Sequence, residues 1–408
     1  MSKSVVLTRD NWREATRDLP AMVGRAMSFC LGLERGVLKF RTGGKVFVIQ
    51  GRKDGREAEM VIHDFNMAKR VLGRGQVGIA ESYIAGEWSS PDLTQFLQLF
   101  CENWRIISTF VRDKPIARAL MRVRHWLNRN TRRGSRRNIL AHYDLGNDFY
   151  GLWLDPSMTY SSAMFGESSE PDLTEAQMRK YQALSERLSL SDQDDVVEIG
   201  CGWGGFAEFA AKEIGCHVTG ITISEEQHAY ASKRIAAAGL NEKVEIRLQD
   251  YRDLDGRFDK IASIEMFEAV GEEYWPTYFS KLENCLKPGG RAGLQVITIQ
   301  DSMFGTYRMF NPDFIQRYIF PGGMLPCPSV LQDVSENAGL KITDEHIFGL
   351  DYARTLARWR NSFFAAWPEI TKLGFDERFR RIWEYYLCYC EAGFRSGNVD
   401  VRQMVFTR

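Results

Sequence analysis

The sequence has few of the features that mark a zinc protein, a disulfide-linked secreted protein or a membrane-spanning protein. Its eight cysteines are scattered, none forms a Cys-x-x-Cys pair, and only six histidines accompany them. This pattern disfavours a metal site and predicts free thiols in a reducing compartment. No apolar run approaches the roughly eighteen residues that span a bilayer, and residues 1–20 are too polar for a secretory signal. We therefore expect a cytoplasmic protein, free in solution or lying on a membrane.

The chain also lacks an excess of charge, because Lys and Arg total 53 and Asp and Glu total 53. Residues 112–137 are the exception, with ten basic residues against the single acid Asp113, and with Leu120, Val123 and Trp126 interleaved. Such a basic amphipathic stretch suits a solvated linker helix, a nucleic-acid patch or a surface for anionic lipid headgroups. No nucleic-acid-binding module accompanies it. The tryptophan favours an anionic membrane surface, and we expect no nucleic-acid partner.

Composition and turn signals divide the chain into three parts. Residues 1–111 contain alternating apolar segments around Gly43-Gly44, which predict a hairpin, and helical patterns over 64–74 and 92–110. These features predict a small α+β domain whose sequence alone suggests no chemistry. Residues 112–137 form the basic amphipathic linker, and residues 138–408 form the catalytic domain.

The catalytic part is organised around a glycine-dense turn after a short buried strand. The stretch Val196–Gly205 places glycines at 200, 202 and 204 after Glu198, a spacing that differs from the Gly-x-Gly-x-x-Gly of dinucleotide-binding folds. The next strand ends with Thr222 and Ser224, where a dinucleotide enzyme would place a carboxylate for the ribose. The turn resembles that of S-adenosylmethionine (SAM) methyltransferases.

Strands alternate with helices through the rest of this part. Strands are expected at 196–199, 218–223, 244–248, 259–264 and 291–298, with later helices at 353–366 and 376–394 and a last strand at 399–407. This alternation predicts a parallel sheet that binds ligands at the carboxyl ends of its strands. The expected fold class is therefore α/β, a Rossmann-like class I SAM-dependent methyltransferase domain with a smaller α+β N-terminal domain.

Several ordered blocks together resemble the cyclopropane-fatty-acyl-phospholipid synthase family, which includes the mycolic-acid cyclopropane synthases. The blocks are His142–Tyr150, Thr159–Ser161, Glu198–Gly205, Thr222–Gln227, Phe267–Gly271, Phe320–Gly323 and Tyr352–Leu356. Gly78–Trp88 also looks like the longer bacterial members, which act on phospholipids and carry a lipid-binding-like N-terminal domain.

The resemblance implies a reaction in which a methylene group passes from SAM to the double bond of an unsaturated acyl chain in a membrane phospholipid. The alkene attacks the sulfonium methyl, and the resulting carbocation closes to a cyclopropane when a bound bicarbonate ion removes a proton from the new methyl group. The same resemblance implies a peripheral protein on the inner face of the membrane, and a homodimer is plausible.

The resemblance also assigns roles to individual residues. The cofactor-binding set implied for SAM is Tyr160, Ser161, Glu198, Gly200, Gly202, Gly204, Thr222, Gln227, Asp250 and Tyr251. The catalytic set, which would hold bicarbonate, is Glu268, Tyr352, Gln295, Ser162 and Ile297. Aromatic residues that are candidates for facing the carbocation are Phe267, Tyr307, Phe310, Tyr318 and Phe320, although each is as well explained by core packing.

Two positions depart from the family pattern. Ser162 stands where the family has cysteine, and Gln295 stands where it has histidine. Glutamine hydrogen-bonds an oxyanion but carries no charge and takes no proton at neutral pH. Gln295 therefore favours an alternative activity, a SAM-dependent fatty-acid methyltransferase that gives a methyl-branched unsaturated chain without ring closure. A methyltransferase for a soluble substrate and a non-catalytic lipid-binding protein are weaker alternatives.

Overall fold

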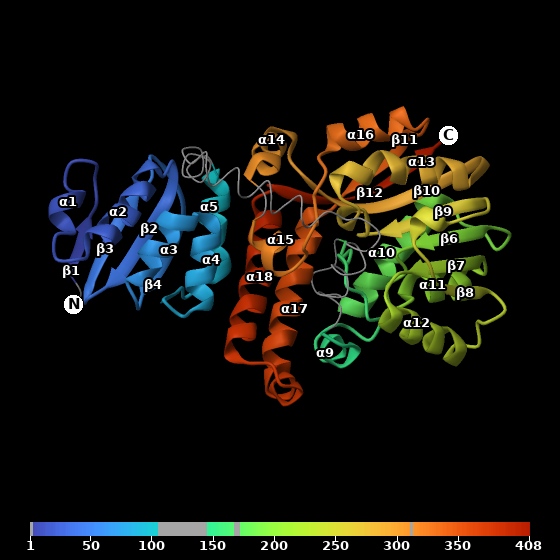
Figure 1. Cartoon of the computed structure of the whole chain (residues 1–408), viewed down its shortest axis with the longest axis horizontal. Coiled ribbons are helices and arrows are strands. Elements are labelled where there is room, and N and C mark those ends of the chain that lie inside the picture. The colour runs from blue at the N-terminus through green and yellow to red at the C-terminus, as the bar shows by residue number, and fades with distance from the viewer. Residues whose placement is uncertain (1–2, 105–144, 167–171, 311–312) are drawn as a thin grey trace. The chain divides into compact units, whose positions relative to one another are not determined.

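The computed structural model describes residues 3–104, 145–166, 172–310 and 313–408, and Figure 1 traces the chain. The chain divides into two compact units. Unit 1 comprises residues 1–124, 306–319 and 374–398, and unit 2 comprises residues 125–305, 320–373 and 399–408. The basic linker at 112–137 lies outside the described residues. The expected continuous domain 138–408 needs correction, because two of its segments pack with the N-terminal unit.

Unit 1 is built on a five-stranded sheet with the order β1-β3-β2-β4-β5. The hairpin expected around Gly43-Gly44 is confirmed, since both glycines have positive φ between the antiparallel strands β2 and β3. Helix α5 begins at the Asp92 cap, as expected, and ends at Glu102; residues 105–110 of the expected helix lie outside the described residues. The strands are β1 (Lys3–Val6), β2 (Arg35–Thr42), β3 (Lys45–Gln50), β4 (Lys53–Ile62) and β5 (Trp88–Ser89).

The helices of unit 1 come from three distant parts of the sequence. The N-terminal part supplies α1 (Trp12–Ala15), α2 (Ala21–Phe29), α3 (Asn66–Arg74), α4 (Gln76–Ile84) and α5 (Leu93–Glu102). The later segments supply α15 (Phe314–Tyr318) and α18 (Glu377–Arg395). Both later helices contact α4, and α18 also packs along α5. The chain passes between the units within α14 (Asp301–Phe310).

Unit 2 is built on a seven-stranded sheet with the order β11-β12-β10-β9-β6-β7-β8. The five strands from β6 to β10 are parallel, as the sequence predicted, whereas β12 runs antiparallel to β10 and β11 runs antiparallel to β12. The strands are β6 (Asp195–Ile199), β7 (His217–Thr222), β8 (Val244–Leu248), β9 (Phe258–Ile264), β10 (Leu286–Ile299), β11 (Lys341–Ile347) and β12 (Val399–Thr407).

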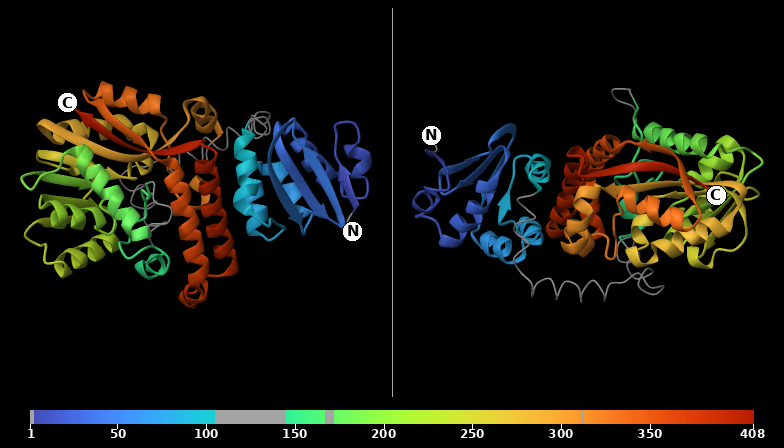
Figure 2. Two further views of the ribbon diagram at one scale, coloured as in Figure 1. Left: turned by 180° about the vertical axis from the view of Figure 1, so that it is seen from behind. Right: turned by 90° about the horizontal axis from the view of Figure 1, so that it is seen from above.

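Helices cover both faces of this sheet, as Figure 2 shows from behind and from above. One face carries α10 (Leu173–Leu188), α11 (Gly205–Phe209) and α12 (Glu225–Ala237), and the other carries α13 (Trp275–Cys285) and α16 (Pro328–Asn337). The short helix α9 (Asn147–Gly151) precedes this layer, and the long helix α17 (Gly349–Ile370) packs against β12. The strand order reverses between β6 and β9, and in such sheets ligands bind at the carboxyl ends on either side of that point.

The glycine turn after β6 depends on backbone conformations that other residues adopt only under strain. Gly200, Gly202 and Gly204 have φ values of 82°, 53° and 81°. A Cβ atom on Gly200 would lie 2.6 Å from Cγ of Met266, whereas one on Gly202 would meet no atom within 4 Å. Gly200 therefore allows a close approach of the loop after β9, and Gly202 leaves open space for a ligand on the turn.

A substitution at Gly200 tests this close approach. We expect Gly200→Ala to lower the free energy of unfolding by about 2 kcal/mol or more, because backbone strain and the contact with Met266 add. Gly239→Ala is the matched control, since its φ is also positive, at 70°, but a Cβ there meets nothing within 4 Å. Urea denaturation measures both. An equal loss in the two variants would show that Met266 does not constrain the turn.

Candidate active site

The candidate site lies at the carboxyl ends of β6, β9 and β10, at the reversal point of the sheet. Glu198 occupies the end of β6, Glu265 follows β9 directly, and Gln295 lies on β10. Because β9 lies between β6 and β10, the three side chains come to the same edge of the sheet although almost a hundred residues separate the first from the last.

Glu265 is the centre of the hydrogen-bond network. Its Oε1 accepts from the Ser162 backbone N–H at 2.9 Å and from Nε2 of Gln295 at 2.8 Å, and its Oε2 accepts from the Tyr352 hydroxyl at 2.6 Å. Burial raises the pKa of this carboxyl, and the bonds from Tyr352, Ser162 and Gln295 oppose that shift. The backbone of Glu265 has a φ of 51°, which for a residue other than glycine implies strain.

Glu268 is the second buried carboxyl group of the site. Its Oε1 accepts from the Ile297 backbone N–H, and its Oε2 is buried without a hydrogen-bond partner among the described residues. Burial, and then the neighbouring Glu265, raise the pKa of Glu268 to about 8. At neutral pH this carboxyl is therefore mostly protonated.

The structure brings together all five residues of the predicted catalytic set, but around an acid that the sequence analysis missed. Three of them, Tyr352, Gln295 and Ser162, donate to Glu265, while Ile297 donates to Glu268. The signal for Glu265 was its place immediately after the fourth core strand, where a side chain enters a sheet-edge site. The sequence pointed to Glu268 instead, because Glu268 lies in the block Phe267–Gly271 that resembles the family.

The segment from Tyr160 to Ser162 is held by helix α10. Nζ of Lys180 donates to Oγ of Ser161 at 2.8 Å, and Nε2 of Gln177 donates to the Ser161 carbonyl at 2.9 Å. Lys180 is fully buried, and burial lowers its pKa to about 7 against the opposing charge of Glu265 and other acids. Oε1 of Gln177 is buried without a partner among the described residues. Lys180 and Gln177 of α10 therefore place an amine and an unsatisfied acceptor beside this segment. Such groups suit the carboxylate and the ammonium of an amino-acid ligand.

Other residues predicted to bind the cofactor form local bonds in the turns after β6, β7 and β8. Glu198 accepts the Ala207 backbone N–H, and burial raises its pKa to about 8. Oγ1 of Thr222 donates to Oε1 of Gln227 at 2.8 Å. The carboxylate of Asp250 is paired in a bidentate manner with Arg252, at 2.8 and 2.6 Å. Tyr251, which follows Asp250, packs edge-on against Tyr278.

The aromatic residues proposed to face a carbocation are dispersed in the structure. Phe267 is buried and stacks on Trp275, so it belongs to the core. Tyr307 and Tyr318 belong to unit 1, and nothing is described of the Phe310 side chain. Tyr160, which was singled out for SAM instead, belongs to an aromatic cluster: its ring lies 5.2 Å from Trp359, and it also packs against Tyr150 and Trp153.

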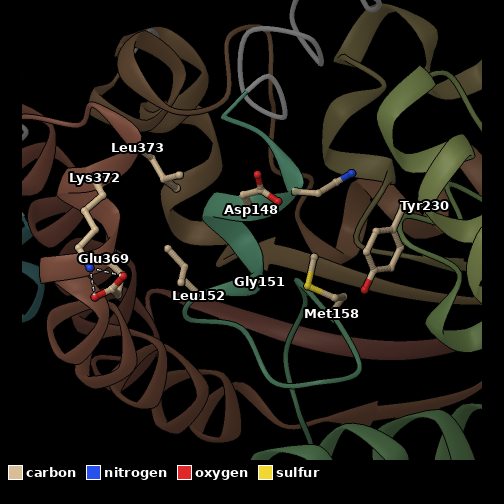
Figure 3. A pocket seen from close by; sticks show the side chains of 9 residues that line it. Asp148, Gly151, Leu152, Met158, Tyr230, Glu369, Lys372 and Leu373 are labelled. Carbon is tan, nitrogen blue, oxygen red and sulfur yellow. Dashed lines mark hydrogen bonds and ion pairs between the residues drawn. The ribbon is translucent and has the colours of Figure 1, made fainter.

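A cavity of about 540 Å³ is lined in part by Gly151 and Leu152, which lie between Tyr150 and Trp153 in the sequence (Figure 3). Its lining comes from α9, the loop at Met158, helix α12 through Tyr230, and the turn after α17. Asn147, also in the lining, accepts from Nε1 of Trp203 on the glycine turn at 2.7 Å. In Figure 3 Lys372 pairs with Glu369 at the rim. The cavity is thus linked to the glycine turn, while Glu265 and Glu268 are outside its lining.

The described residues contain no cluster of His, Cys, Asp and Glu that could hold a metal ion. Among the same residues, no helix combines the length and the apolar character needed to cross a bilayer.

Comparison with known proteins places these features in a family. The family model described as mycolic acid cyclopropane synthetase matches residues 130–404. The tuberculostearic acid methyltransferase UfaA1 of Mycobacterium tuberculosis is 41% identical over 377 residues, covering 88% of this chain and 85% of that protein. The cyclopropane-fatty-acyl-phospholipid synthase of Escherichia coli is 37% identical over 355 residues, covering 86% of this chain and 88% of the enzyme.

Solved structures confirm the fold class. The cyclopropane synthase MmaA2 of Mycobacterium tuberculosis superposes with a TM-score of 0.63 at 29% identity, covering 67% of this chain and 98% of that one. The mycolic acid cyclopropane synthase CmaA1, solved with S-adenosylhomocysteine (SAH) and CTAB, superposes with a TM-score of 0.62 at 30% identity, covering the same shares. Unit 2 is therefore a class I SAM-dependent methyltransferase fold.

The raised pKa of Glu268 predicts a pH-dependent stability. Between its ordinary value of 4.5 and about 8 the folded protein keeps this proton while the unfolded chain loses it. Stability therefore falls as pH rises through that window, by up to about 1.4 kcal/mol per pH unit from this group. Glu268→Gln removes the contribution, so the variant should gain stability relative to the parent between about pH 5 and 7.5.

Urea unfolding at several pH values measures the difference. Glu198, whose pKa is also raised, is common to both proteins and cancels in the comparison. Glu242→Gln, at an exposed position, is the matched control and should follow the parent at every pH. A parent and a Glu268→Gln variant with parallel pH profiles would show that Glu268 titrates as an ordinary carboxyl group.

Proposed function

The chain belongs to the mycolic acid cyclopropane synthetase family and is a SAM-dependent transferase, and from that premise we propose a specific reaction. The protein methylates the double bond of an unsaturated acyl chain in a membrane phospholipid and leaves a methyl-branched, unsaturated chain. Relatives named as a tuberculostearic acid methyltransferase and as a cyclopropane-fatty-acyl-phospholipid synthase both support a lipid acyl substrate.

In this proposal the glycine turn and the Tyr160–Ser161 segment hold SAM. The open space at Gly202 takes the amino-acid part of SAM, and Lys180 positions Ser161 for the SAM carboxylate. Thr222 and Gln227 lie at the ribose, and Asp250 and Tyr251 lie at the adenine. SAM supplies an electrophilic methyl group, and these polar residues fix its direction relative to the acyl chain.

The bond changes are the same up to the cation for either product. The alkene π electrons form a bond to the methyl carbon, and the carbon–sulfur bond breaks so that its electron pair stays on SAH. One alkene carbon is then a cation. If a C–H bond of the new methyl group supplies the next electron pair, a cyclopropane closes; if a C–H bond of the chain supplies it, a double bond forms beside the methyl branch.

The observation that carries the proposal is the hydrogen bonding of Glu265. Ring closure by bicarbonate needs donors that hold the ion near the new methyl group. Three of those expected donors, Tyr352, Gln295 and Ser162, already bond to the Glu265 carboxylate. In this proposal Glu265 acts in place of bicarbonate among these donors, and a tethered base replaces the mobile base needed for ring closure.

A tethered carboxylate also has an electrostatic role. Buried charge interacts strongly with a developing cation, because little water screens it. With Glu265 fixed by three donors, its negative charge requires no reorganisation when the cation forms. The carbocation is stabilised where it forms. The proton then leaves from a carbon of the acyl chain and not from the new methyl group.

Ring closure, which the resemblance to the family implies, is the second candidate, and Glu268 favours it. Oε2 of Glu268 is buried without a partner among the described residues, so once ionised it can accept a proton from the new methyl group. The cyclopropane synthases among the relatives support the same outcome. In another form of this candidate, a bicarbonate ion held by Glu268 and Ile297 alone would remove the proton from the new methyl group.

The proposal includes a membrane location. The basic stretch 112–137 would hold the protein on the anionic inner surface of the cytoplasmic membrane. A homodimer would place two such stretches on one surface and strengthen attachment through effective concentration.

Deuterium counting distinguishes the two products. The purified protein is incubated with unsaturated phospholipid vesicles and SAM that carries a trideuterated methyl group, and the fatty acids are examined by mass spectrometry. We expect three deuteriums in a product that still contains a double bond. Two deuteriums with the double bond lost would mean ring closure, and would overturn the first candidate in favour of the second.

Heat-inactivated protein and vesicles of fully saturated phospholipid are the controls, and both should give no incorporation. If neither product forms from unsaturated vesicles, although SAM binds, the lipid substrate itself is refuted.

Substitution of Glu265 tests whether its hydrogen-bonded carboxyl group takes part in the reaction. Glu265→Gln removes the charge, and we expect turnover to fall about 10²-fold, as for other preorganised electrostatic groups. Glu265→Gly frees Tyr352, Gln295 and the Ser162 N–H, and it suits the positive φ of this position. With added bicarbonate, Glu265→Gly is expected to shift the product toward two deuteriums.

Glu273→Gln, at an exposed position in the same connection, is the matched control and should retain the parent rate and product. Unchanged turnover in Glu265→Gln, together with an unchanged deuterium count in Glu265→Gly, would remove Glu265 from the reaction.

A further inference from the structure

Unit 1 contains a cavity of about 650 Å³ lined by an unusual number of arginines. Four helices from three parts of the chain form it: α3, α4, α15 and the start of α18. The charged lining residues are Arg70, Arg74, Arg317, Arg378, Arg381, Glu81 and Glu377. Five guanidinium groups against two carboxylates give the cavity an excess of three positive charges.

A single buried carboxylate fixes part of this wall. Glu81 accepts two bonds from Arg74 at 2.8 Å and one from the Tyr318 hydroxyl at 2.8 Å, and it lies 3.3 Å from Nη2 of Arg317. Its side chain is only 8% exposed. Glu81 therefore fixes the positions of Arg74, Arg317 and Tyr318. Its single negative charge is shared by two arginines and cannot neutralise the other three in the lining.

The remaining arginines keep most of their donors. Arg70 bonds to Glu87 through Nε alone, and Arg381 uses one nitrogen for the Tyr83 carbonyl and another for Glu377. Arg378 has neither a hydrogen bond nor an ion pair with any residue that the structure describes, although it lines the cavity. Ion pairing within the wall thus explains the placement of several arginines but leaves Arg378 without a structural role.

We propose that this cavity binds the phosphate group of an anionic ligand, and that the phosphate belongs to a phospholipid headgroup. Guanidinium groups match phosphate with paired, charge-assisted hydrogen bonds. The volume lies within the roughly 300–1,000 Å³ common for ligand sites, which leaves room beyond a bare phosphate. Ile84, Ala85 and Gly86 add an uncharged wall beside the arginines. The choice of a lipid over a free phosphate rests on the proposed function.

Binding of soluble probes to the full chain tests the site without any turnover. Dihexanoyl phosphatidylglycerol, kept below its micelle concentration, carries the headgroup but no double bond, and inorganic phosphate carries the phosphate alone. Titration calorimetry gives both affinities for the parent and for Arg378→Gln and Arg378→Lys. Arg378 is exposed and unpaired within the described chain, so these variants should fold; circular dichroism and SAM binding verify this.

We expect the phosphatidylglycerol affinity to fall about tenfold in Arg378→Gln, the loss of one charge-assisted contact. Arg378→Lys should recover only part of it, because lysine keeps the charge and loses the paired geometry. Arg25→Gln, which removes an exposed arginine elsewhere in unit 1, is the matched control and should bind as the parent does.

The outcomes separate the two sources of phosphate. Tight binding of the lipid with weak binding of inorganic phosphate supports the headgroup, whereas equal binding of both supports the phosphate site and overturns its assignment to lipid. Equal affinities in Arg378→Gln and Arg25→Gln, or no binding of either probe to the parent, would overturn the site. Because the probe has no double bond, none of these results depends on the deuterium count that tests the proposed function.

Discussion

The hydrogen-bond network at the carboxyl end of the sheet in unit 2 depends on one partly buried carboxyl group, that of Glu265, directly after β9. Its three donors come from the segment before α10, from β10 and from α17, so one side chain ties together parts of unit 2 that are far apart in the sequence. A buried acid of this kind is stable only while its donors remain in place, since removing a partner leaves an uncompensated group. The arrangement of the reactive end of the sheet and the charge of the site are therefore set by the same bonds.

The balance of charge at this end of the sheet favours a cationic ligand. Glu198 is buried, Glu265 and Glu268 are partly buried, and the buried amine of Lys180, which interacts electrostatically with Glu198 and Glu265, has a pKa lowered to about 7. Burial disfavours every charged form, so Glu198 and Glu268 hold protons that exposed carboxyls would lose. In the proposed reaction, the sulfonium of SAM and the carbocation would bring positive charge to these acids and favour their ionised forms. The ionised carboxyl groups would in turn stabilise the cations electrostatically.

The sequence predicted the strands and turns of unit 2 well, because the patterns that indicate them are local in the sequence. Short β-rich runs, the glycine turn and the final strand at 399–407 each have a pattern that neighbouring residues determine, and β12 agrees with it to the residue. The passage of 306–319 and 374–398 into unit 1 was not predictable, since helices of similar amphipathic pattern pack equally well on either unit. The five catalytic candidates gathered as expected, but their bonding to Glu265 depends on contacts across three elements, which no periodicity encodes.

Glu265 and Gln295 form a single hydrogen-bonded unit. Oε1 of Gln295 accepts from Nε2 of Gln403 at 3.1 Å, and that same nitrogen donates to the Lys180 carbonyl at 3.1 Å. The acceptor end of the Gln295 amide is thereby occupied, and its donor end is directed at Glu265. A neutral donor at this position suits a carboxyl group that belongs to the chain, because the two share a hydrogen bond without adding a second titrating group. A histidine suits a mobile anion instead, since it can supply a positive charge when the anion binds. Under the proposed function, Glu265 acts in place of a bound anion, and Gln295 is its neutral hydrogen-bond donor.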